Sequence, residues 1–68
     1  MENKWSKIIY QLRKESNISQ KALAKAVGVT QKAVGFWESG VNEPKASYIV
    51  ALSKYFGVSA DYLLGIED

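Results

Sequence analysis

The sequence predicts an all-α protein of five short helices, and three features of the 68-residue chain indicate this. Apolar residues recur at intervals of three and four positions, which places them on one face of a helix. A Ser or Thr precedes three of these periodic segments, where its hydroxyl can cap a helix N-terminus. A Gly follows three of them, where helices commonly end in a left-handed residue. A chain of this length forms one small domain, so we expect residues 1–68 to be a single unit with an ordered core at about 4–64.

The first helix is expected over residues 4–15. Trp5, Ile9 and Leu12 stand at i, i+4 and i+7, so they share one face of that helix. Asn3 can serve as its N-cap. This helix therefore turns one aromatic and two aliphatic side chains toward the core.

The second and third helices are expected over 20–27 and 31–39, each after a capping hydroxyl and before a Gly. The caps are Ser19 and Thr30, the terminating glycines are Gly28 and Gly40, and the inward side chains are Leu23, Ala24, Val27, Val34 and Trp37. A strand over 27–36 is an alternative because two valines alternate there, but the two glycines inside it weaken a strand. One continuous helix is another alternative, since eleven residues make three turns, but the glycine at 28 favours a break.

The fourth helix follows the loop 41–44 and runs to about Phe56, with Ile49, Leu52 and Phe56 on its inner face. Its start is the vaguest boundary, and Pro44 suits a first helical turn.

A last short helix begins after Gly57 and the cap Ser59. Its inward residue is Leu63, which leaves Leu64 exposed. Residues 65–68 are expected to be a frayed tail.

Composition excludes several classes of chemistry. The chain has no Cys and no His, which excludes disulfides, thiolate nucleophiles, imidazole bases and the usual zinc ligand sets. We therefore expect no enzymatic activity, cofactor, metal or small-molecule ligand. No apolar run approaches the ~20 residues that span a bilayer, and residues 1–10 do not resemble a secretory signal. A cytoplasmic protein with no membrane partner is expected.

The charge is small overall but unevenly distributed. The formal net charge is +2. Residues 1–34 contain seven Lys or Arg against two Asp or Glu, whereas residues 35–68 contain two against five. The first half could therefore face a polyanion, although an ordinary solvated surface explains the asymmetry equally well.

The tripeptide Gln-Lys-Ala occurs at 20–22 and again at 31–33. Both copies follow a capping hydroxyl, so both open a helix. A helix N-terminus presents free N–H groups and a partial positive charge, which suit a phosphate. Two such starts, each with a Gln and a Lys, suit a nucleic acid.

The spacing around these two starts is more specific. Gln20, Ala24, Gly28, Val34 and Trp37 occupy positions 1, 5, 9, 15 and 18 of a helix-turn-helix frame. The chain resembles the lambdoid phage repressor and Cro-type helix-turn-helix family, also called the XRE family, from about residue 9 to 64. Further marks of the resemblance are Leu12-Arg13, Ile18-Ser19-Gln20, Leu23-Ala24, Trp37-Glu38-Ser39-Gly40, Pro44 and Phe56-Gly57-Val58-Ser59.

The resemblance implies a five-helix domain that binds double-stranded DNA with its third helix in the major groove. It implies a sequence-specific transcriptional regulator, expected to repress bacterial or prophage genes by blocking polymerase at an operator. The residues expected to contact DNA are Gln20, Thr30, Gln31, Lys32, Gly35, Phe36, Asn42 and Lys45. Among them, Gln31 can bond adenine and Lys32 can donate to guanine, while Gln20 is expected to contact a phosphate and to support Gln31.

One residue departs from the family pattern, and a neighbouring one is unusual within a helix. Phe36 stands where the family usually has a polar residue. It could pack on a thymine methyl group, fold back on the core rim, or meet a protein partner. Gly35 is costly within a helix, and it could admit the DNA backbone closely or make room for Phe36. Glu43 places a negative charge beside Asn42 and Lys45, which opposes a phosphate contact there.

The resemblance also implies contacts within and between chains. Arg13 and Glu38 correspond to an ion pair that ties the first helix to the third. Tyr62, Leu64 and Ile66 are candidates for a homodimer contact through the C-terminal helix. The alternative function is a protein–protein interaction module that uses exposed aromatic anchors, with Phe36 and Tyr62 among them.

Overall fold

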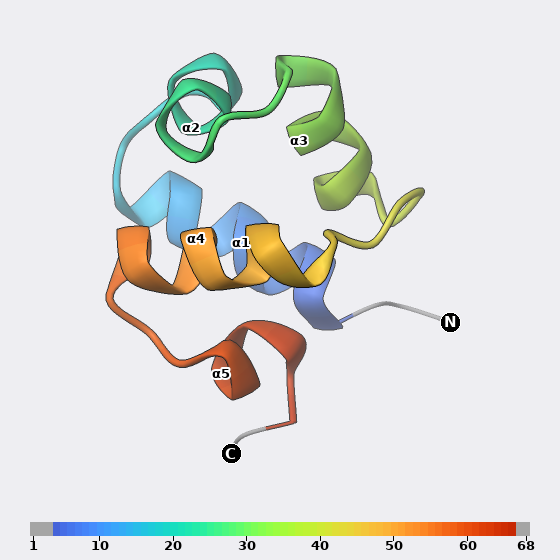
Figure 1. Cartoon of the computed structure of the whole chain (residues 1–68). Helices are drawn as coiled ribbons and strands as arrows, with labels where there is room; N and C mark the ends of the chain where they lie inside the picture. Colours follow the sequence, from blue (N-terminus) through green and yellow to red (C-terminus); the bar gives the residue numbers. More distant parts are fainter. Residues whose placement is uncertain (1–3, 67–68) are drawn as a thin grey trace.

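The computed structural model describes residues 4–66, and within that range it has five α-helices and no strand. The helices are α1 (Lys4–Glu15), α2 (Gln20–Val27), α3 (Gln31–Ser39), α4 (Ala46–Phe56) and α5 (Ala60–Leu64). Figure 1 shows α1 and α4 across the middle of the molecule, with α2 and α3 on one side of them and α5 on the other. The predicted fold class is confirmed. Asn3, the expected cap of the first helix, lies outside the described residues.

Three helices begin at the hydroxyl caps that the sequence predicts. The Oγ of Ser19 accepts a hydrogen bond from the backbone N–H of Ala22 at 3.0 Å. Thr30 Oγ1 accepts from the N–H of Ala33 at 3.1 Å, and the Oγ of Ser59 accepts from the third residue of α5 at 3.0 Å. Each cap satisfies one of the N–H groups that a helix start leaves without an intrahelical acceptor.

The start of α4 differs from the expectation. Pro44 does not lie in the first turn of this helix, because Lys45 is the N-cap, with extended backbone angles of φ −64° and ψ 160° and no side-chain capping bond. Pro44 instead lies buried in the preceding loop. It has no N–H group to satisfy, so burial of its backbone nitrogen leaves no donor without an acceptor.

The turn between α2 and α3 depends on the backbone of Gly28. Its φ is +81°, and its N–H donates to the carbonyl of Ala24 at 2.9 Å. A Cβ at this position would meet no atom within 4 Å. The left-handed backbone, rather than crowding, is therefore what favours Gly here.

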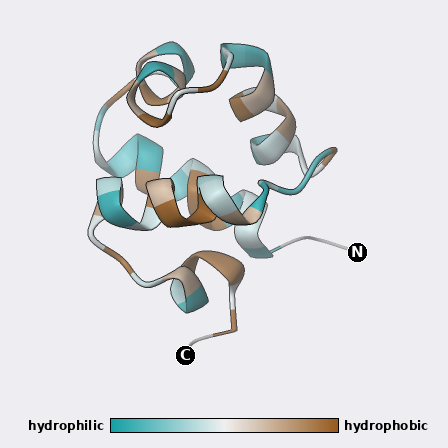
Figure 2. Ribbon diagram, in the orientation of Figure 1, coloured by the Kyte–Doolittle hydropathy of each residue, from teal (hydrophilic) through white to brown (hydrophobic). Residues whose placement is uncertain are grey.

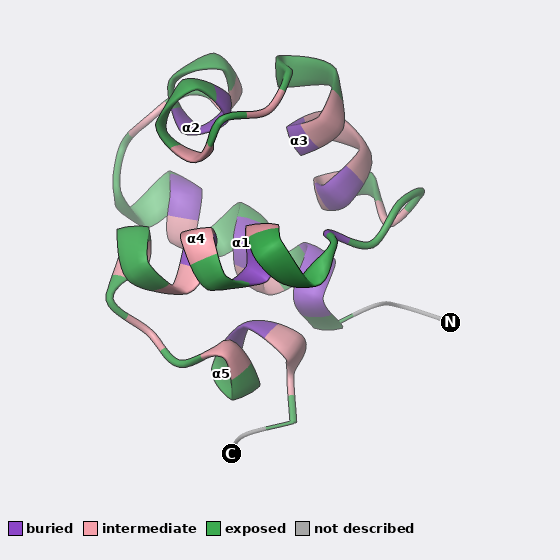
Figure 3. Cartoon of the chain, viewed as in Figure 1, coloured by how far each residue is buried: buried purple, intermediate pink, exposed green. Residues whose placement is uncertain are grey.

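The hydrophobic core lies where the helices converge. Within the described residues, α2 packs on α3 and α4, while α1 packs on α3 and α5. Figure 2 shows apolar stretches on α4 and α5, and Figure 3 shows the buried residues distributed over all five helices and Pro44. The core cluster comprises Trp5, Ile9, Leu23, Ala24, Val34, Trp37, Ile49, Leu52 and Leu63. Leu12 and Phe56, expected on inner faces, are half-buried and pack against this cluster.

None of the helices within 4–66 is long and apolar enough to cross a membrane.

The end of α5 is more ordered than the frayed tail that the sequence suggests. The N–H groups of Gly65 and Ile66 donate to the carbonyls of Tyr62 and Asp61, both at 3.1 Å. Gly65 has φ +78°, and a Cβ there would lie 2.5 Å from the Cβ of Lys4. This glycine therefore lets the chain close onto the start of α1. Residues 67–68 lie outside the described part.

Candidate nucleic-acid interface

The two faces of α3 differ in exposure. Val34 and Trp37 are buried in the core, which fixes how this helix is rotated. Gln31 and Lys32 are exposed in its first turn, and Gly35 is half-buried. The core packing of α3 therefore sets which side chains it presents to a partner.

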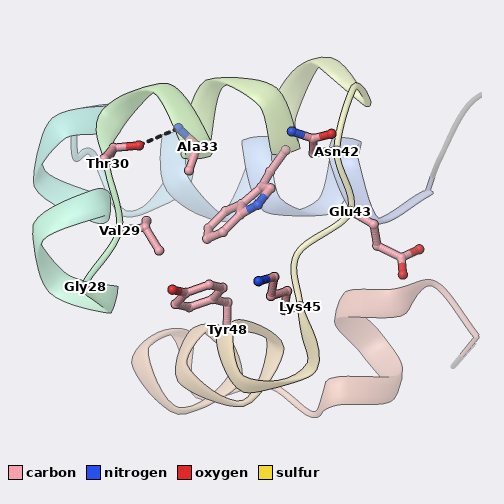
Figure 4. A pocket seen from close by; sticks show the side chains of 9 residues that line it. Gly28, Val29, Thr30, Ala33, Asn42, Glu43, Lys45 and Tyr48 are labelled. Carbon is pink, nitrogen blue, oxygen red and sulfur yellow. Dashed lines mark hydrogen bonds between the residues drawn. The ribbon is translucent and has the colours of Figure 1, made fainter.

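A first hollow lies between the start of α3, the loop before α4, and α4 itself. It brings together three of the predicted residues, Thr30, Asn42 and Lys45. Figure 4 shows Thr30 and Val29 on one side of it, and Asn42 and Glu43 on the loop at the other. Glu43 lines the same hollow, so a carboxylate stands beside the two polar loop residues, as the sequence indicates.

The aromatic side of this hollow was not predicted. The rings of Trp37 and Tyr48 lie with their centroids 5.7 Å apart, at an interplanar angle of 42°. Tyr48 precedes Leu52 by four residues, so the helical period that places Leu52 in the core also turns Tyr48 inward. This four-residue spacing in the sequence could have predicted the inward position of Tyr48.

A second hollow lies over the middle of α3 and the start of α2. It brings together the five other predicted residues, and Ser39, which the sequence analysis did not single out, completes its lining. The residues are Gln20, Gln31, Lys32, Gly35, Phe36 and Ser39. The eight predicted DNA contacts thus divide between two neighbouring hollows that share α3.

The side chain of Phe36 is neither fully exposed nor part of the hydrophobic core cluster. It is half-buried, and it is not among the described side chains that pack against the core cluster. The ammonium of Lys32, one helical turn earlier, lies 5.7 Å from the centroid of its ring. This distance is within the range of a cation–π contact.

One carboxylate ties three helices together beneath this surface. Arg13 of α1 donates to Glu38 of α3 through Nε at 2.6 Å and Nη2 at 3.1 Å, and through Nη1 to the carbonyl of Ile18 at 2.9 Å. The side chains of Arg13 and Glu38 are only 10% and 5% exposed. The hydrogen bonding of its guanidinium to the Glu38 carboxylate is the main cause that raises the pKa of Arg13, against an opposing effect of burial. The guanidinium therefore stays charged wherever the protein is folded.

Gln20 joins this network through a contact with Glu38 that was not predicted. Its Nε2 donates to Glu38 Oε1 at 3.0 Å. A carboxylate can only accept hydrogen bonds, so this contact turns the amide nitrogen of Gln20 toward Glu38 and its oxygen away. No buried side-chain nitrogen or oxygen among residues 4–66 lacks a hydrogen-bond partner.

The C-terminal dimer candidates lie on α5 and just beyond it. Tyr62 is 40% exposed and Ile66 is 72% exposed. Leu64 was expected to be exposed, but it is half-buried and packs against the core cluster. Its place beside Ile49 and Val50 of α4, in a shallow apolar hollow, accounts for the difference.

Comparison with known proteins identifies the family. A helix-turn-helix family model matches residues 9–63. The chain belongs to this helix-turn-helix family. Within it, the chain is 46% identical over 52 residues to repressor protein C2 of Salmonella phage P22, a match that covers 76% of the chain and 24% of that protein. It is 37% identical over 60 residues to the HTH-type transcriptional activator BcrR of Enterococcus faecalis, covering 88% of the chain and 29% of that protein.

The match therefore covers less than a third of the length of each of these two relatives. Solved structures match over almost the whole helix-turn-helix domain. A crystal structure of the P22 c2 repressor in complex with a synthetic operator has a TM-score of 0.87 and 40% identity, covering 93% of this chain and 96% of that one. The DNA-binding domain of the same repressor in solution has a TM-score of 0.84 and 40% identity.

Proposed function

We propose that this chain is a sequence-specific double-stranded DNA-binding domain of a transcriptional regulator, with α3 in the major groove. The observation that carries the proposal is its likeness to the P22 c2 repressor, solved on an operator and matched at TM-score 0.87 over nearly the full domain. The proposed action is repression of bacterial or prophage genes in the cytoplasm, because a protein that occupies an operator blocks polymerase sterically. Binding, rather than catalysis, is the whole proposed activity.

The two hollows along α3 suit different kinds of contact with DNA. In the second, Gln31 and Lys32 are exposed in the first turn of the helix, from which base edges are read in this docking mode. A Gln can bond adenine in a bidentate way, and a Lys can donate to guanine.

The first hollow is suited to phosphates. Thr30 Oγ1 uses a lone pair to accept from Ala33 and keeps its hydroxyl proton to donate. Asn42 and Lys45 supply further donors on the facing loop, while Glu43 weakens the local attraction for a polyanion. Gln20 is assigned a phosphate contact through its remaining amide proton. Contacts of this kind set register and orientation, and the base contacts specify sequence.

A homodimer through α5 is part of the proposal. Tyr62 and Ile66 expose apolar surface on α5 and just after it, and Leu64 of α5 lines a shallow apolar hollow. Figure 1 places α5 away from α3, so contact through α5 leaves the proposed DNA face accessible. Two-fold dimers of this class read half-sites ~34 Å apart, one turn of DNA.

The alternative, a protein-interaction module, receives less support. Its proposed anchors are Phe36 on α3 and Tyr62 and Leu64 on α5, and the two helices lie on opposite sides of α1 and α4 in Figure 1. They do not form one patch. Leu64 is moreover half-buried against the core.

The deciding experiment is selection of the purified chain against a randomised duplex library at roughly 150 mM salt, because affinity without a stated salt concentration has no fixed meaning. A two-fold symmetric consensus is the expected result. Binding to it should fall with salt at a log–log slope of about −0.9 for each phosphate neutralised. No enrichment, together with salt-independent capture of a protein partner, would favour the interaction module.

The direction of regulation needs a separate measurement, since one relative is named a repressor and another an activator. The recovered operator should be placed across a promoter in a purified transcription reaction. Falling transcript yield as the chain saturates the operator is expected. Rising yield would replace repression with activation and leave the DNA-binding proposal intact.

A further inference from the structure

We propose that the first hollow, between the start of α3 and α4, binds a small aromatic carboxylate, and that such a ligand competes with the operator. The competition rests on the proposed function, which assigns phosphate contacts to the rim of the same hollow. Binding of the ligand to the free chain does not depend on that function.

One side of this hollow, here called its floor, is apolar. It is formed by Val29, Ala33, Trp37 and Tyr48, which are buried or half-buried. The rings of Trp37 and Tyr48 lie with their centroids 5.7 Å apart, and Figure 4 shows Tyr48 facing the space beside the loop. A phosphate group has no apolar part, so the proposed phosphate contacts leave this floor unused. An aromatic ring would use it, because aromatic side chains attract further rings in edge-to-face and offset arrangements.

The rim of the hollow carries hydrogen-bond donors. Thr30, Asn42 and Lys45 are exposed there. The hydroxyl of Thr30 accepts from the N–H of Ala33 and keeps its proton to donate. Within residues 4–66, the side chains of Asn42 and Lys45 have no hydrogen-bond or ion-pair partner. Two neutral donors and one ammonium suit a carboxylate, since hydrogen bonds to an ionised acceptor are the stronger kind.

The size of the hollow is that of a small-molecule site. Its volume is about 620 Å³, and ligand sites of roughly 300–1,000 Å³ combine an apolar lining with a few polar groups that fix orientation. A ring that bears one carboxylate divides in the same way between floor and rim. Glu43 also lines the hollow, and its carboxylate repels a second negative charge. The ligand class is therefore an aromatic monoanion.

The first test uses the full chain without DNA and cinnamate as the probe, in a titration followed by the NMR shifts of the backbone amides. The dissociation constant should be on the order of a few millimolar, because a ligand of this size has few atoms to contribute. The largest shifts should fall at 28–33 and 42–48. Cinnamamide, which has no charge, should bind about threefold more weakly. Acetate, which has no ring, should show no saturation.

Three variants test the rim. Lys45→Gln should weaken cinnamate binding about threefold and remove its advantage over cinnamamide. Lys54→Gln is the matched control, because Lys54 is an exposed lysine of α4 that does not line the hollow, and it should change nothing. Glu43→Gln removes the opposing charge and should tighten cinnamate binding about twofold.

The competition is measured on one copy of the chain and a half-site of the operator recovered by selection. Cinnamate at about ten times its dissociation constant should weaken half-site binding roughly tenfold. Sodium acetate at the same concentration controls for ionic strength and should have a much smaller effect.

Four results would overturn the inference: no saturable shifts with cinnamate, shifts centred on the apolar hollow at Val50 and Leu64 instead, equal binding of cinnamate and cinnamamide to the parent chain, or cinnamate bound together with the operator. Each leaves operator binding standing. Failure to recover any operator would instead remove the proposed function and the competition with it, while the titration without DNA still decides the ligand site.

Discussion

Gln31 is exposed at the first position of α3, and its amide can both donate and accept in a fixed plane. Its neighbours Thr30 and Ala33 are joined by the capping hydrogen bond, so the backbone that carries Gln31 is already fixed before DNA is bound. The backbone at Gln31 therefore needs little further ordering when the side chain reads a base.

Replacing Gln31 with Ala should cost about 1–3 kcal/mol of operator binding and relax the preference at one base pair. The measurement is competition among operators that carry all four base pairs at each position. Gln11→Ala, at an exposed position of α1, is the matched control and should change neither affinity nor preference. Unchanged discrimination in Gln31→Ala would remove this residue from the reading face.

The Arg13–Glu38 pair is almost fully buried, so its partners depend on each other. Glu38→Gln should lower the free energy of unfolding by about 3 kcal/mol, because it leaves a buried guanidinium uncompensated. Urea denaturation measures the loss. Glu15→Gln, which changes an exposed carboxylate, should stay within about 0.5 kcal/mol of the parent.

The double variant Arg13→Met with Glu38→Leu removes both charges. It therefore separates the contribution of the ion pair to stability from the penalty of burying one unpaired charge. It should recover most of the stability lost in Glu38→Gln, since apolar replacements of buried ion pairs are often neutral. A double variant as unstable as the single one would show that the hydrogen bonds to Gln20 and Ile18 dominate.

At the scale of the elements, each of the last four helices ends at a glycine with positive φ, but these glycines are not equivalent. A Cβ at Gly57 would meet nothing within 4 Å, whereas one at Gly65 would collide with the side chain of Lys4. The end of α5 is therefore held by its packing on α1 as well as by its backbone.

Gly57→Ala should cost about 1–2 kcal/mol from the left-handed backbone alone. Gly65→Ala should cost about 1–3 kcal/mol more, because overpacking adds to the same strain. Thermal unfolding of the two variants measures the difference. Equal losses would mean that α5 moves away from α1 without cost.

At the scale of the whole molecule, the domain measures 28 × 25 × 22 Å, so a single copy covers only part of a two-half-site operator. The apolar surface at Tyr62 and Ile66 is small. Stable interfaces bury about 1,200–2,000 Å², and this one is expected to form mainly when two copies are already on DNA.

Tyr62→Glu should abolish cooperative binding to a two-half-site operator and leave binding to one half-site unchanged relative to its control. The substitution also suits the local helix, because a Glu three residues after Ser59 completes a capping box. Tyr55→Glu is the control, since Tyr55 is a similarly exposed tyrosine on α4. Both constants come from titration of full and half operators. Cooperativity that persists in Tyr62→Glu would place the dimer contact elsewhere.

The sequence predicted the features that depend on neighbours along the chain. The caps at Ser19 and Thr30 follow from one hydroxyl and the next few residues. The contact of Gly65 with Lys4 joins residues from opposite ends of the described chain, and no local pattern encodes it. The hydrogen bond from Gln20 to Glu38 joins α2 to α3, and no local pattern encodes it either. Pro44 is compatible with either side of a helix start, so its placement needed the structure.

The division between the two faces of α3 has a consequence for how this domain can change over generations. Val34 and Trp37 hold the helix in the core, and the proposed reading positions lie between and beside them without contributing to that core. Substitutions at the reading positions can therefore alter the preferred operator while the protein stays folded at every step. A lineage that carries this domain can diverge in its target genes much faster than in its architecture, and a designer can retarget it through the same few codons.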